Sequence, residues 1–438
     1  MESIFEINSI ERYSEYKETN IEWAGKIPID WTTLPIRAIF EERNERNDGP
    51  KTDFILSVTK DRGVIPYDEK GAVGNNKSED IERYKLVYPN DFVINKMNVI
   101  IGSLGMSKYF GAFSQVYLVY KPRTNKINIK YYSYLFSNPT FYKSLIKYCT
   151  GIMELRESLN REEFKKINLP FPDFDTQTSI VSFLDRKTAL IDQAIQIKMK
   201  QIELLKERKQ ILIQKAVTRG LNPNVKMKDS GVEWIGEIPE HWEMKRLSFL
   251  SYKIGDGLHG TPTYTDDTDF YFINGNNLAN GKISLTTQTR TVSEKEFRLN
   301  DKKLNSNSIL LSINGTIGNV ARYCGEKIML GKSAAYINLN SNVNPEFVQR
   351  FLESNVFKIY YELALSGTTI NNLSLYSINK TPIIYPPTNE QKHIVDRIKE
   401  VEASLDTGIQ SKANEIEILK EYKSTLINSA VTGKIKVS

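Results

Sequence analysis

The chain contains one unit twice. Residues 21–31 (IEWAGKIPIDW) and 232–242 (VEWIGEIPEHW) share six of eleven residues at an offset of 211. Residues 177–218 and 391–432 align without a gap at an offset of 214, and 19 of these 42 positions are identical. Such a period far exceeds that of a solenoid repeat. The sequence therefore predicts the duplication of a whole domain together with a helix that follows it.

The longer repeated segment has the pattern of a long helix. Its apolar residues lie three, four or seven positions apart, which is a heptad-like spacing. Pro172 and Pro387 lie just before the two copies, and Gly220 and Gly433 lie just after them. Such residues are common at helix boundaries. At about 1.5 Å per residue, a helix of this length extends on the order of 60 Å.

Each helix needs a partner, because its apolar stripe is too large to face water. The other copy is the nearest candidate, so we predict an antiparallel coiled coil with pseudo-twofold symmetry. The residues expected to pack in it are Ile180, Leu184, Ile191, Ile202, Leu205 and Leu212 in the first helix, and Ile394, Ile398, Leu405, Ile416, Leu419 and Leu426 in the second.

Lysines interrupt the stripe at matched positions, where Lys198 corresponds to Lys412 and Lys209 to Lys423. We favour the interpretation that their alkyl stems pack while the ammonium groups reach water. The alternative is that they fix the register of the helix pair or meet another protein.

The sequence predicts four parts: a globular domain over residues 1–175, a helix over 176–220, a second globular domain over 221–388 and a helix over 389–438. The globular parts are rich in short β-type runs separated by Gly, Asn and Asp clusters. Each is expected to be an α/β-mixed domain with a twisted sheet and short helices.

The four tryptophans recur as matched pairs, Trp23 with Trp234 and Trp31 with Trp242. We interpret them as packing anchors where each domain meets a helix end.

The composition excludes several classes of protein. The net charge of +6 and the pI of about 8.8 suit a nucleic-acid partner, although many mildly basic proteins have none. The two cysteines and three histidines are too scattered for a disulfide framework or a recognisable metal site. No apolar run approaches membrane-spanning length. We therefore expect a soluble cytoplasmic protein with no membrane contact.

Catalytic motifs are missing from the sequence. Residues 325–333 resemble a phosphate-binding loop but have five residues between the two glycines, where the motif requires four. Residues 385–388 have the prolines of an amino-methyltransferase loop without its flanks. We predict no catalytic residue and no metal ligand.

Several segments carry a resemblance to a known family. The most specific are residues 232–242, residues 215–231 (KAVTRGLNPNVKMKDSG) and residues 167–181 (INLPFPDFDTQTSIV). Shorter matches lie at residues 256–262 (DGLHGTP) and 311–319 (LSINGTIGN), and at Arg156 to Leu159 (RESL). In their order and duplication, these segments resemble the specificity subunit of type I restriction–modification enzymes over nearly the whole chain.

The resemblance implies two target-recognition domains, each reading one half of a split, asymmetric sequence in double-stranded DNA, and paired helices that set the spacing. It implies two methyltransferase subunits that dock on this chain and bring S-adenosylmethionine. It also implies two motor-nuclease subunits that use ATP and Mg²⁺. This chain is then expected to bind no cofactor and to catalyse no reaction, in the cytoplasm of a bacterium or archaeon.

The chemistry of DNA suggests which residues touch it, because Lys and Arg neutralise phosphates while amides, hydroxyls and some Arg read base edges. For any single cation, a solvated surface charge is the more common role. The first domain also lacks a DGxHGTP-like loop, so its contacts are harder to assign. The phosphate candidates are Lys96, Lys108, Arg156, Arg322 and Lys332, and the base-reading candidates are Gln115, His259, Thr261, Asn314 and Thr316.

Two other functions stay open at this point. The chain could be a coiled-coil adaptor whose globular domains bind proteins, or a DNA-binding regulator that works without partner subunits.

Overall fold

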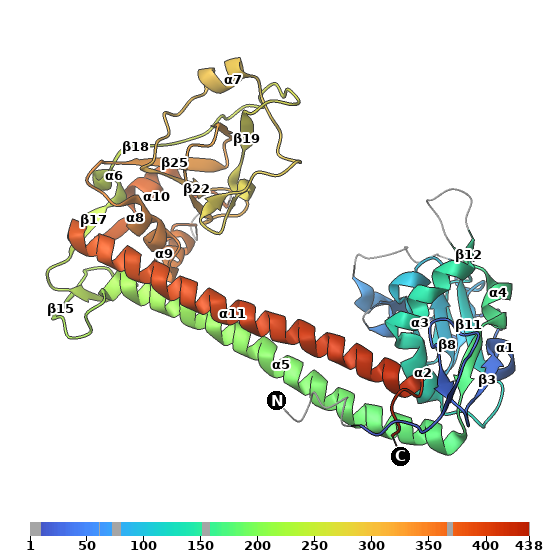
Figure 1. The fold of residues 1–438 in the computed structure, drawn as a ribbon. Coiled ribbons are helices and arrows are strands. Elements are labelled where there is room, and N and C mark those ends of the chain that lie inside the picture. Colours follow the sequence, from blue (N-terminus) through green and yellow to red (C-terminus); the bar gives the residue numbers. More distant parts are fainter. Residues whose placement is uncertain (1–9, 61, 72–79, 151–157, 366–370, 438) are drawn as a thin grey trace. The chain divides into compact units, whose positions relative to one another are not determined.

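The structure is a computed structural model that describes residues 10–60, 62–71, 80–150, 158–365 and 371–437 (Figure 1). The chain divides into two compact units. Unit 1 comprises Met1–Met199 and Ala413–Ser438, and unit 2 comprises Lys200–Lys412. Each unit therefore combines one globular part with a segment of each long helix.

The core of unit 1 is a four-stranded antiparallel sheet in the order β4-β11-β8-β9. These strands are β4 (Phe40–Glu42), β11 (Tyr117–Pro122), β8 (Phe92–Asn95) and β9 (Leu104–Met106). The two central strands are short apolar runs whose side chains are buried on both faces, as expected for strands inside a covered sheet.

Unit 2 contains the same sheet, in the order β18-β25-β22-β23 and also antiparallel. Its strands are β18 (Ser251–Asp256), β25 (Ala334–Leu339), β22 (Ser308–Ser312) and β23 (Val320–Arg322). Every residue of β22 and β25 is buried. The duplication that the sequence predicts is thus present in the strand order itself, and the predicted α/β-mixed class is confirmed.

One helix at the same place in each unit connects the sheet to the long helices. In unit 1 this is α2 (Ile129–Ser137), whose Phe136 stacks on Phe92 of β8 with ring centroids 4.0 Å apart. In unit 2 it is α8 (Pro345–Leu352), which buries Phe347 and Phe351 in the core.

Short elements complete unit 1. They are β1 (Tyr16–Lys17), β2 (Ile27–Pro28), β3 (Thr32–Pro35), α1 (Ile36–Ile39), β5 (Leu56–Thr59), β6 (Gly63–Pro66), η3 (Tyr67–Lys70), β7 (Lys85–Val87), η4 (Val99–Ile101), β10 (Gly111–Phe113), α3 (Pro139–Ser144), η5 (Leu145–Tyr148), β12 (Cys149–Thr150), β13 (Ser158–Leu159), α4 (Arg161–Lys166) and β14 (Asn168–Phe171).

Unit 2 has a different set around its sheet. These elements are β15 (Met227–Asp229), β16 (Glu237–Pro239), β17 (Glu243–Arg246), α6 (Leu247–Leu250), β19 (Tyr271–Ile273), η6 (Gly275–Asn277), β20 (Leu278–Ala279), β21 (Lys282–Ile283), α7 (Glu294–Leu299), β24 (Ile328–Leu330), α9 (Asn355–Leu365), α10 (Leu375–Lys380) and β26 (Pro382–Tyr385).

The strands beside the sheet show how far the two units differ. In unit 1, β10 pairs with β7 in antiparallel orientation. In unit 2, β24 stands at the corresponding place before β25 and pairs with β19 in parallel orientation. The frame of the sheet is common to both units, whereas the segments attached to it are not.

The two long helices, α5 (Phe174–Arg219) and α11 (Thr388–Val431), are paired in both units. In unit 1, Lys423 forms an ion pair with Asp192 at 2.7 Å. In unit 2, Lys209 forms one with Asp406 at 2.8 Å. In unit 1 the contacts run in opposite chain directions, because Lys198 pairs with Glu415 and Asp192 with Lys423. The same holds in unit 2, where Gly408 faces Leu205 and Asp406 pairs with Lys209. The predicted antiparallel pairing is therefore confirmed inside each unit.

These ion pairs also bear on the role of the lysines that interrupt the apolar stripe. Asp192 and Asp406 are matched positions of the repeat, and so are Lys209 and Lys423. One pair of positions thus makes the same contact twice, in reciprocal directions. The lysines bind carboxylates of the opposite helix, which favours the interpretation that they help to fix its register.

The residues of the predicted stripe differ in burial along the helices. Most are buried, namely Ile180, Leu184, Ile191, Ile394, Ile398, Ile416, Leu419 and Leu426. The four that stay partly exposed all belong to unit 2, and they are Ile202, Leu205, Leu212 and Leu405.

A buried glutamine attaches the first turns of α5 to the domain in unit 1. Gln177 donates a hydrogen bond through Nε2 to the carbonyl of Pro172 (2.8 Å) and accepts one through Oε1 from the backbone N–H of Asn128 (2.7 Å). Asn128 is the N-cap residue of α2. The glutamine therefore fixes where α2 meets α5.

Unit 2 repeats this connection at α11. Gln391 donates to the carbonyl of Pro386 (2.8 Å) and accepts from the backbone N–H of Asn344 (3.3 Å), which caps α8. Both glutamines have no exposed surface. Polar groups buried to this degree are stable only when they are hydrogen-bonded.

The tryptophans divide into two kinds. Trp31 lies against Gly433, two residues after the end of α11, and Trp242 lies against Gly220, directly after α5. These two confirm the predicted packing at helix ends. Trp23 and Trp234 instead pack on helices of their own domains, beside Phe141 and Tyr360 respectively.

Replacing Gln177 with Leu should destabilise the chain by about 1–3 kcal/mol, because the Asn128 N–H and the Pro172 carbonyl lose their partner. Urea unfolding of the full chain measures the loss. Gln196→Leu, at an exposed position of the same helix, is the control and should change stability by less than about 0.5 kcal/mol. Equal losses for the two variants would contradict this role of Gln177.

Candidate nucleic-acid interface

Loops from distant parts of unit 2 meet at one edge of its sheet. The backbone N–H of Leu258 donates to the carbonyl of Leu330 (2.7 Å), and that of Ile313 donates to the carbonyl of Ser333 (3.0 Å). These bonds bring together residues 257–262, 313–319 and 331–333, which we call the loop edge. His259, Thr261, Asn314, Thr316 and Lys332 all belong to it.

Two glycines allow these loops to approach so closely. A Cβ atom on Gly257 would lie 2.2 Å from the carbonyl oxygen of Leu330, and one on Gly331 would lie 2.3 Å from Oδ1 of Asn274. A side chain at position 257 would meet backbone atoms and push its loop away from β24, whereas one at position 331 would displace the side chain of Asn274. Packing therefore favours glycine at these two positions.

The side chains at the loop edge are exposed and polar. Nε2 of His259 lies 2.8 Å from Oδ2 of Asp256, and Oγ1 of Thr316 lies 3.2 Å from Oγ of Ser312. Thr261, Asn314 and Lys332 are exposed as well. Among the described residues, Lys332 has no carboxylate partner. An unpaired cation between hydroxyl and amide groups suits a phosphate beside base edges.

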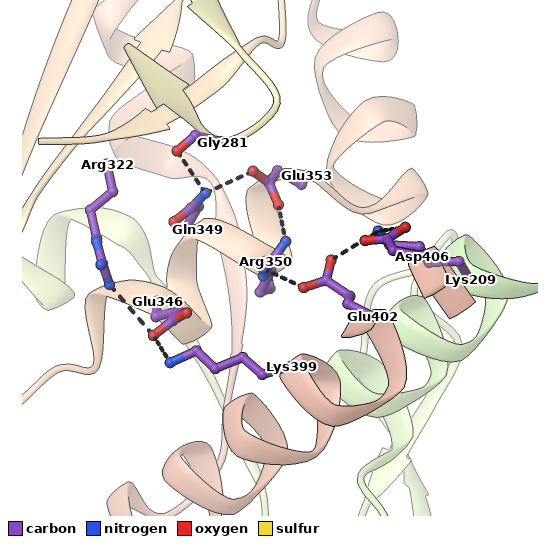
Figure 2. A network of polar contacts seen from close by, with 10 residues as sticks. All are labelled: Lys209, Gly281, Arg322, Glu346, Gln349, Arg350, Glu353, Lys399, Glu402 and Asp406. Carbon is purple, nitrogen blue, oxygen red and sulfur yellow. Dashed lines mark hydrogen bonds and ion pairs between the residues drawn. The ribbon is translucent and has the colours of Figure 1, made fainter. Parts of the chain in front are cut away.

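Arg322 lies elsewhere. It is opposite Ile309 at the beginning of β22, whereas the loop edge follows the end of that strand. Nη1 of Arg322 is 3.4 Å from Oε2 of Glu346, and this carboxylate also binds Lys399 at 2.7 Å (Figure 2). Arg322 is therefore part of the contact between the domain and α11.

Figure 2 also shows a second, separate chain of contacts that reaches both long helices. Arg350 of α8 binds Glu402 of α11 at 2.7 Å, and Lys209 of α5 lies 3.8 Å from the same carboxylate. Glu353 binds Arg350 at 3.2 Å and accepts a hydrogen bond from Gln349 at 2.9 Å, and Gln349 also donates to the carbonyl of Gly281 at 3.2 Å. A chain of polar contacts thus joins the sheet side of the domain to the helix pair within unit 2.

Unit 1 makes the corresponding contact with the charges exchanged. Lys130, the second residue of α2, binds Asp185 of α5 at 2.8 Å. Glu346, the second residue of α8, binds Lys399 of α11. Partial burial alone would raise the pKa of Asp185, but hydrogen bonds from Lys130 and Tyr134 hold that pKa below its ordinary value. In each unit, the second residue of the domain helix therefore has the opposite charge to the residue that it contacts on the long helix.

The candidate DNA-contacting residues of the first domain do not all lie at one edge of its sheet. Lys96 directly follows β8, and Gln115 lies in the turn before β11, whose Tyr117 pairs with Asn95. These two residues therefore share one edge of the sheet. Lys108 follows β9 at the opposite edge, since Met106 pairs with Phe92. Arg156 lies outside the described residues.

A polar cleft of about 440 Å³, which the sequence does not predict, lies next to the loop edge. Amide and hydroxyl groups of residues 274–277 and 286–289 line it, together with Arg290. The signal in the sequence is the pair of runs NGNN and TTQTR. Such runs are also typical of ordinary turns, so they do not stand out without the structure.

Comparison with known proteins agrees with this arrangement. The model of the family described as the type I restriction modification DNA specificity domain matches residues 28–206 and, a second time, residues 239–417. The chain belongs to this family. Both copies cover a sheet together with part of the long helix that follows it.

Relatives in this specificity family are similar over their whole length. A protein of Methanocaldococcus jannaschii, named as the type I restriction enzyme MjaX specificity subunit, is 26% identical over 96% of this chain and 98% of its own. The MjaVIII specificity subunit of the same organism is 24% identical over 96% and 97%. The EcoKI specificity subunit of Escherichia coli is 21% identical over 94% and 90%.

Solved structures share the fold. A chain from a structure of a type I restriction–modification system matches with a TM-score of 0.64 and 13% identity, over 92% of this chain and 98% of that one. The HsdS subunit from Thermoanaerobacter tengcongensis matches with a TM-score of 0.50 and 13% identity, over 93% and 98%.

Members of this family are non-catalytic DNA-binding subunits with two target-recognition domains, and this chain is one of them. Within the described residues, no three His, Cys, Asp or Glu side chains are placed to hold a metal ion. In the same part of the chain, no helix combines the length and apolar character that crossing a bilayer requires.

Substituting Lys332 with Ala should weaken DNA binding most at low salt. If Lys332 contacts one phosphate, the slope of log K against log salt should become less negative by about 0.9. Lys327→Ala, at the far end of β24, is the matched control and should leave the slope unchanged. Fluorescence anisotropy over a salt series measures both. An unchanged slope for Lys332→Ala would remove this residue from the interface.

Reversing the charge of Lys130 on α2 should lower the free energy of unfolding, and reversing the charge of Asp185 on α5 as well should restore it. Lys130→Glu faces Asp185 with a like charge, and adding Asp185→Lys restores the attraction in the order found in unit 2. Because both side chains are largely exposed, we expect a coupling of about 0.2–1 kcal/mol in a double-mutant cycle of unfolding free energies. Lys126→Glu is the control. If the effects of Lys130→Glu and Asp185→Lys on the unfolding free energy were simply additive, the pairing would be contradicted.

Proposed function

We propose that each globular domain of this chain reads one half of a split, asymmetric sequence in double-stranded DNA. The observation that carries the proposal is the combination of one sheet frame in both units with different strands and loops attached to it. Loops on a rigid scaffold are where proteins vary what they bind. Two domains that differ in this way fit two different half-sites.

The helix pair sets the spacing between the half-sites and binds the partner subunits. These partners are two methyltransferase subunits, which bring S-adenosylmethionine, and two motor-nuclease subunits, which use ATP and Mg²⁺. The complex acts in the cytoplasm. The relatives named as type I restriction enzyme specificity subunits support this division of labour.

The surface of α5 supports partner binding by the helices. In unit 1, Leu190 and Ile197 are each about half exposed, at 49% and 50%, and in unit 2 Leu204 and Ile211 are similarly exposed, at 51% and 47%. These residues follow one another at intervals of seven. Such spacing places side chains on one face of a helix, and apolar residues in such an arrangement are typical of a docking surface.

Methylation tests the proposal. The purified chain together with a type I methyltransferase subunit from the same organism should methylate an adenine in each half of one two-part sequence. The chain alone should methylate nothing. Sequencing of methylated genomic DNA from a strain that carries both genes measures the outcome. Binding without any enriched two-part sequence, with the methyltransferase present, would instead favour the adaptor function.

Charged substitutions on the exposed face of α5 should weaken the complex with the methyltransferase. Leu204→Glu with Ile211→Glu places two carboxylates in a surface that we expect to be desolvated, so affinity should fall by tenfold or more, on the order of 1.4 kcal/mol or above. Gln210→Glu, at an exposed position about 100° around the helix from Ile211, is the control. Surface plasmon resonance measures the affinities, and unchanged binding by the double variant would rule out this docking surface.

A further inference from the structure

The polar cleft in unit 2 is built from fixed backbone segments. The N–H of Phe272 donates to the carbonyl of Arg290 (2.8 Å), and the N–H of Ser284 donates to the carbonyl of Asn277 (2.7 Å). The side chain of Asn277 returns a bond to the carbonyl of Ser284 (3.3 Å). The walls of the cleft are therefore ordered without a ligand, which lowers the entropic cost of binding one.

Arg290 is held in this cleft by an aromatic ring. Its guanidinium carbon lies 4.5 Å from the centroid of the Tyr264 ring. Among the described residues, no carboxylate forms an ion pair with Arg290, and its side chain is exposed. A guanidinium that lies over a ring and has no carboxylate partner keeps its N–H donors available, which suits bidentate recognition of two acceptors.

The charges around the cleft indicate which acceptors these are. Asp266 and Asp267 line an adjoining hollow of about 960 Å³ that Arg290 also lines. Two carboxylates repel a phosphate, whereas they accept hydrogen bonds from the exocyclic amine of cytosine. An arginine beside carboxylates thus suits a G·C base pair better than the DNA backbone.

The cleft is continuous with the loop edge. Oγ of Ser333 donates to Oδ1 of Asn274 (2.9 Å) and accepts from the backbone N–H of Gly275 (2.9 Å). Ser333 directly follows Lys332, the cation without a carboxylate partner. Lys332 and the cleft that Arg290 lines are therefore connected through Ser333 and Asn274.

We propose that this cleft is a base-reading site of the second domain and that Arg290 donates to O6 and N7 of a guanine in its half-site. This assignment rests on the function proposed above and specifies which residue determines one base of the target. Arginine paired in this way is the commonest specific contact with guanine in the major groove.

Arg290→Gln tests the assignment, because glutamine prefers adenine to guanine. We expect methylation of the native sequence by the variant with its methyltransferase to fall by about 5- to 150-fold. One G·C position of the second half-site should become relaxed or prefer A·T, while the first half-site and the spacing stay unchanged. Arg298→Gln, an exposed arginine on α7 bound to Glu294, is the matched control and should methylate as the parent chain does.

Two results would overturn the assignment. Equal weakening on all sequences, with a salt slope about 0.9 less negative, would identify Arg290 as a phosphate contact. Unchanged specificity and rate would place it outside the interface. Either result leaves the proposed function intact as long as the parent chain yields a two-part sequence. If the parent chain yields none, the proposed function itself fails.

Discussion

The structure depends on one buried side chain used twice. Gln177 and Gln391 each bind the carbonyl of a proline before a long helix and the N-cap residue of a domain helix. A buried amide is expensive to leave without partners, so each glutamine fixes the angle at which a domain meets its helix. The sheet packs on that domain helix, so the glutamine also determines how the sheet is oriented on the long helix. The loops extend from the sheet and are oriented with it.

The two units differ more from each other the farther a segment lies from this common contact. About two turns further along each long helix, the ion pair of Lys130 with Asp185 in unit 1 is replaced by that of Glu346 with Lys399 in unit 2. Beyond the sheet, whole strands differ in direction. Similarity thus decreases with distance from the helices. This gradient is expected when the helices must present equivalent surfaces to equivalent partners while the loops meet different DNA sequences.

The sequence predicts the repeat, the long helices and their antiparallel pairing well, because these depend on the local spacing of apolar residues. It also places His259, Asn314 and Lys332 on loops that the structure brings together. It cannot separate Arg322 from them, since its partner Glu346 is 24 residues away and becomes a neighbour only through the fold. For the same reason Gln177 and Arg290 pass unnoticed: one is a glutamine at a helix start, the other an arginine in a turn-rich segment.

If the loops read the DNA while the sheet and helices only position them, the loops can be exchanged without changing the rest of the protein. Grafting residues 257–262, 313–319 and 331–333 from a relative of different specificity, and sequencing the methylated DNA, tests this most directly. We predict a changed second half-site with an unchanged first half-site and unchanged spacing. A change in both half-sites, or in the spacing between them, would contradict the account.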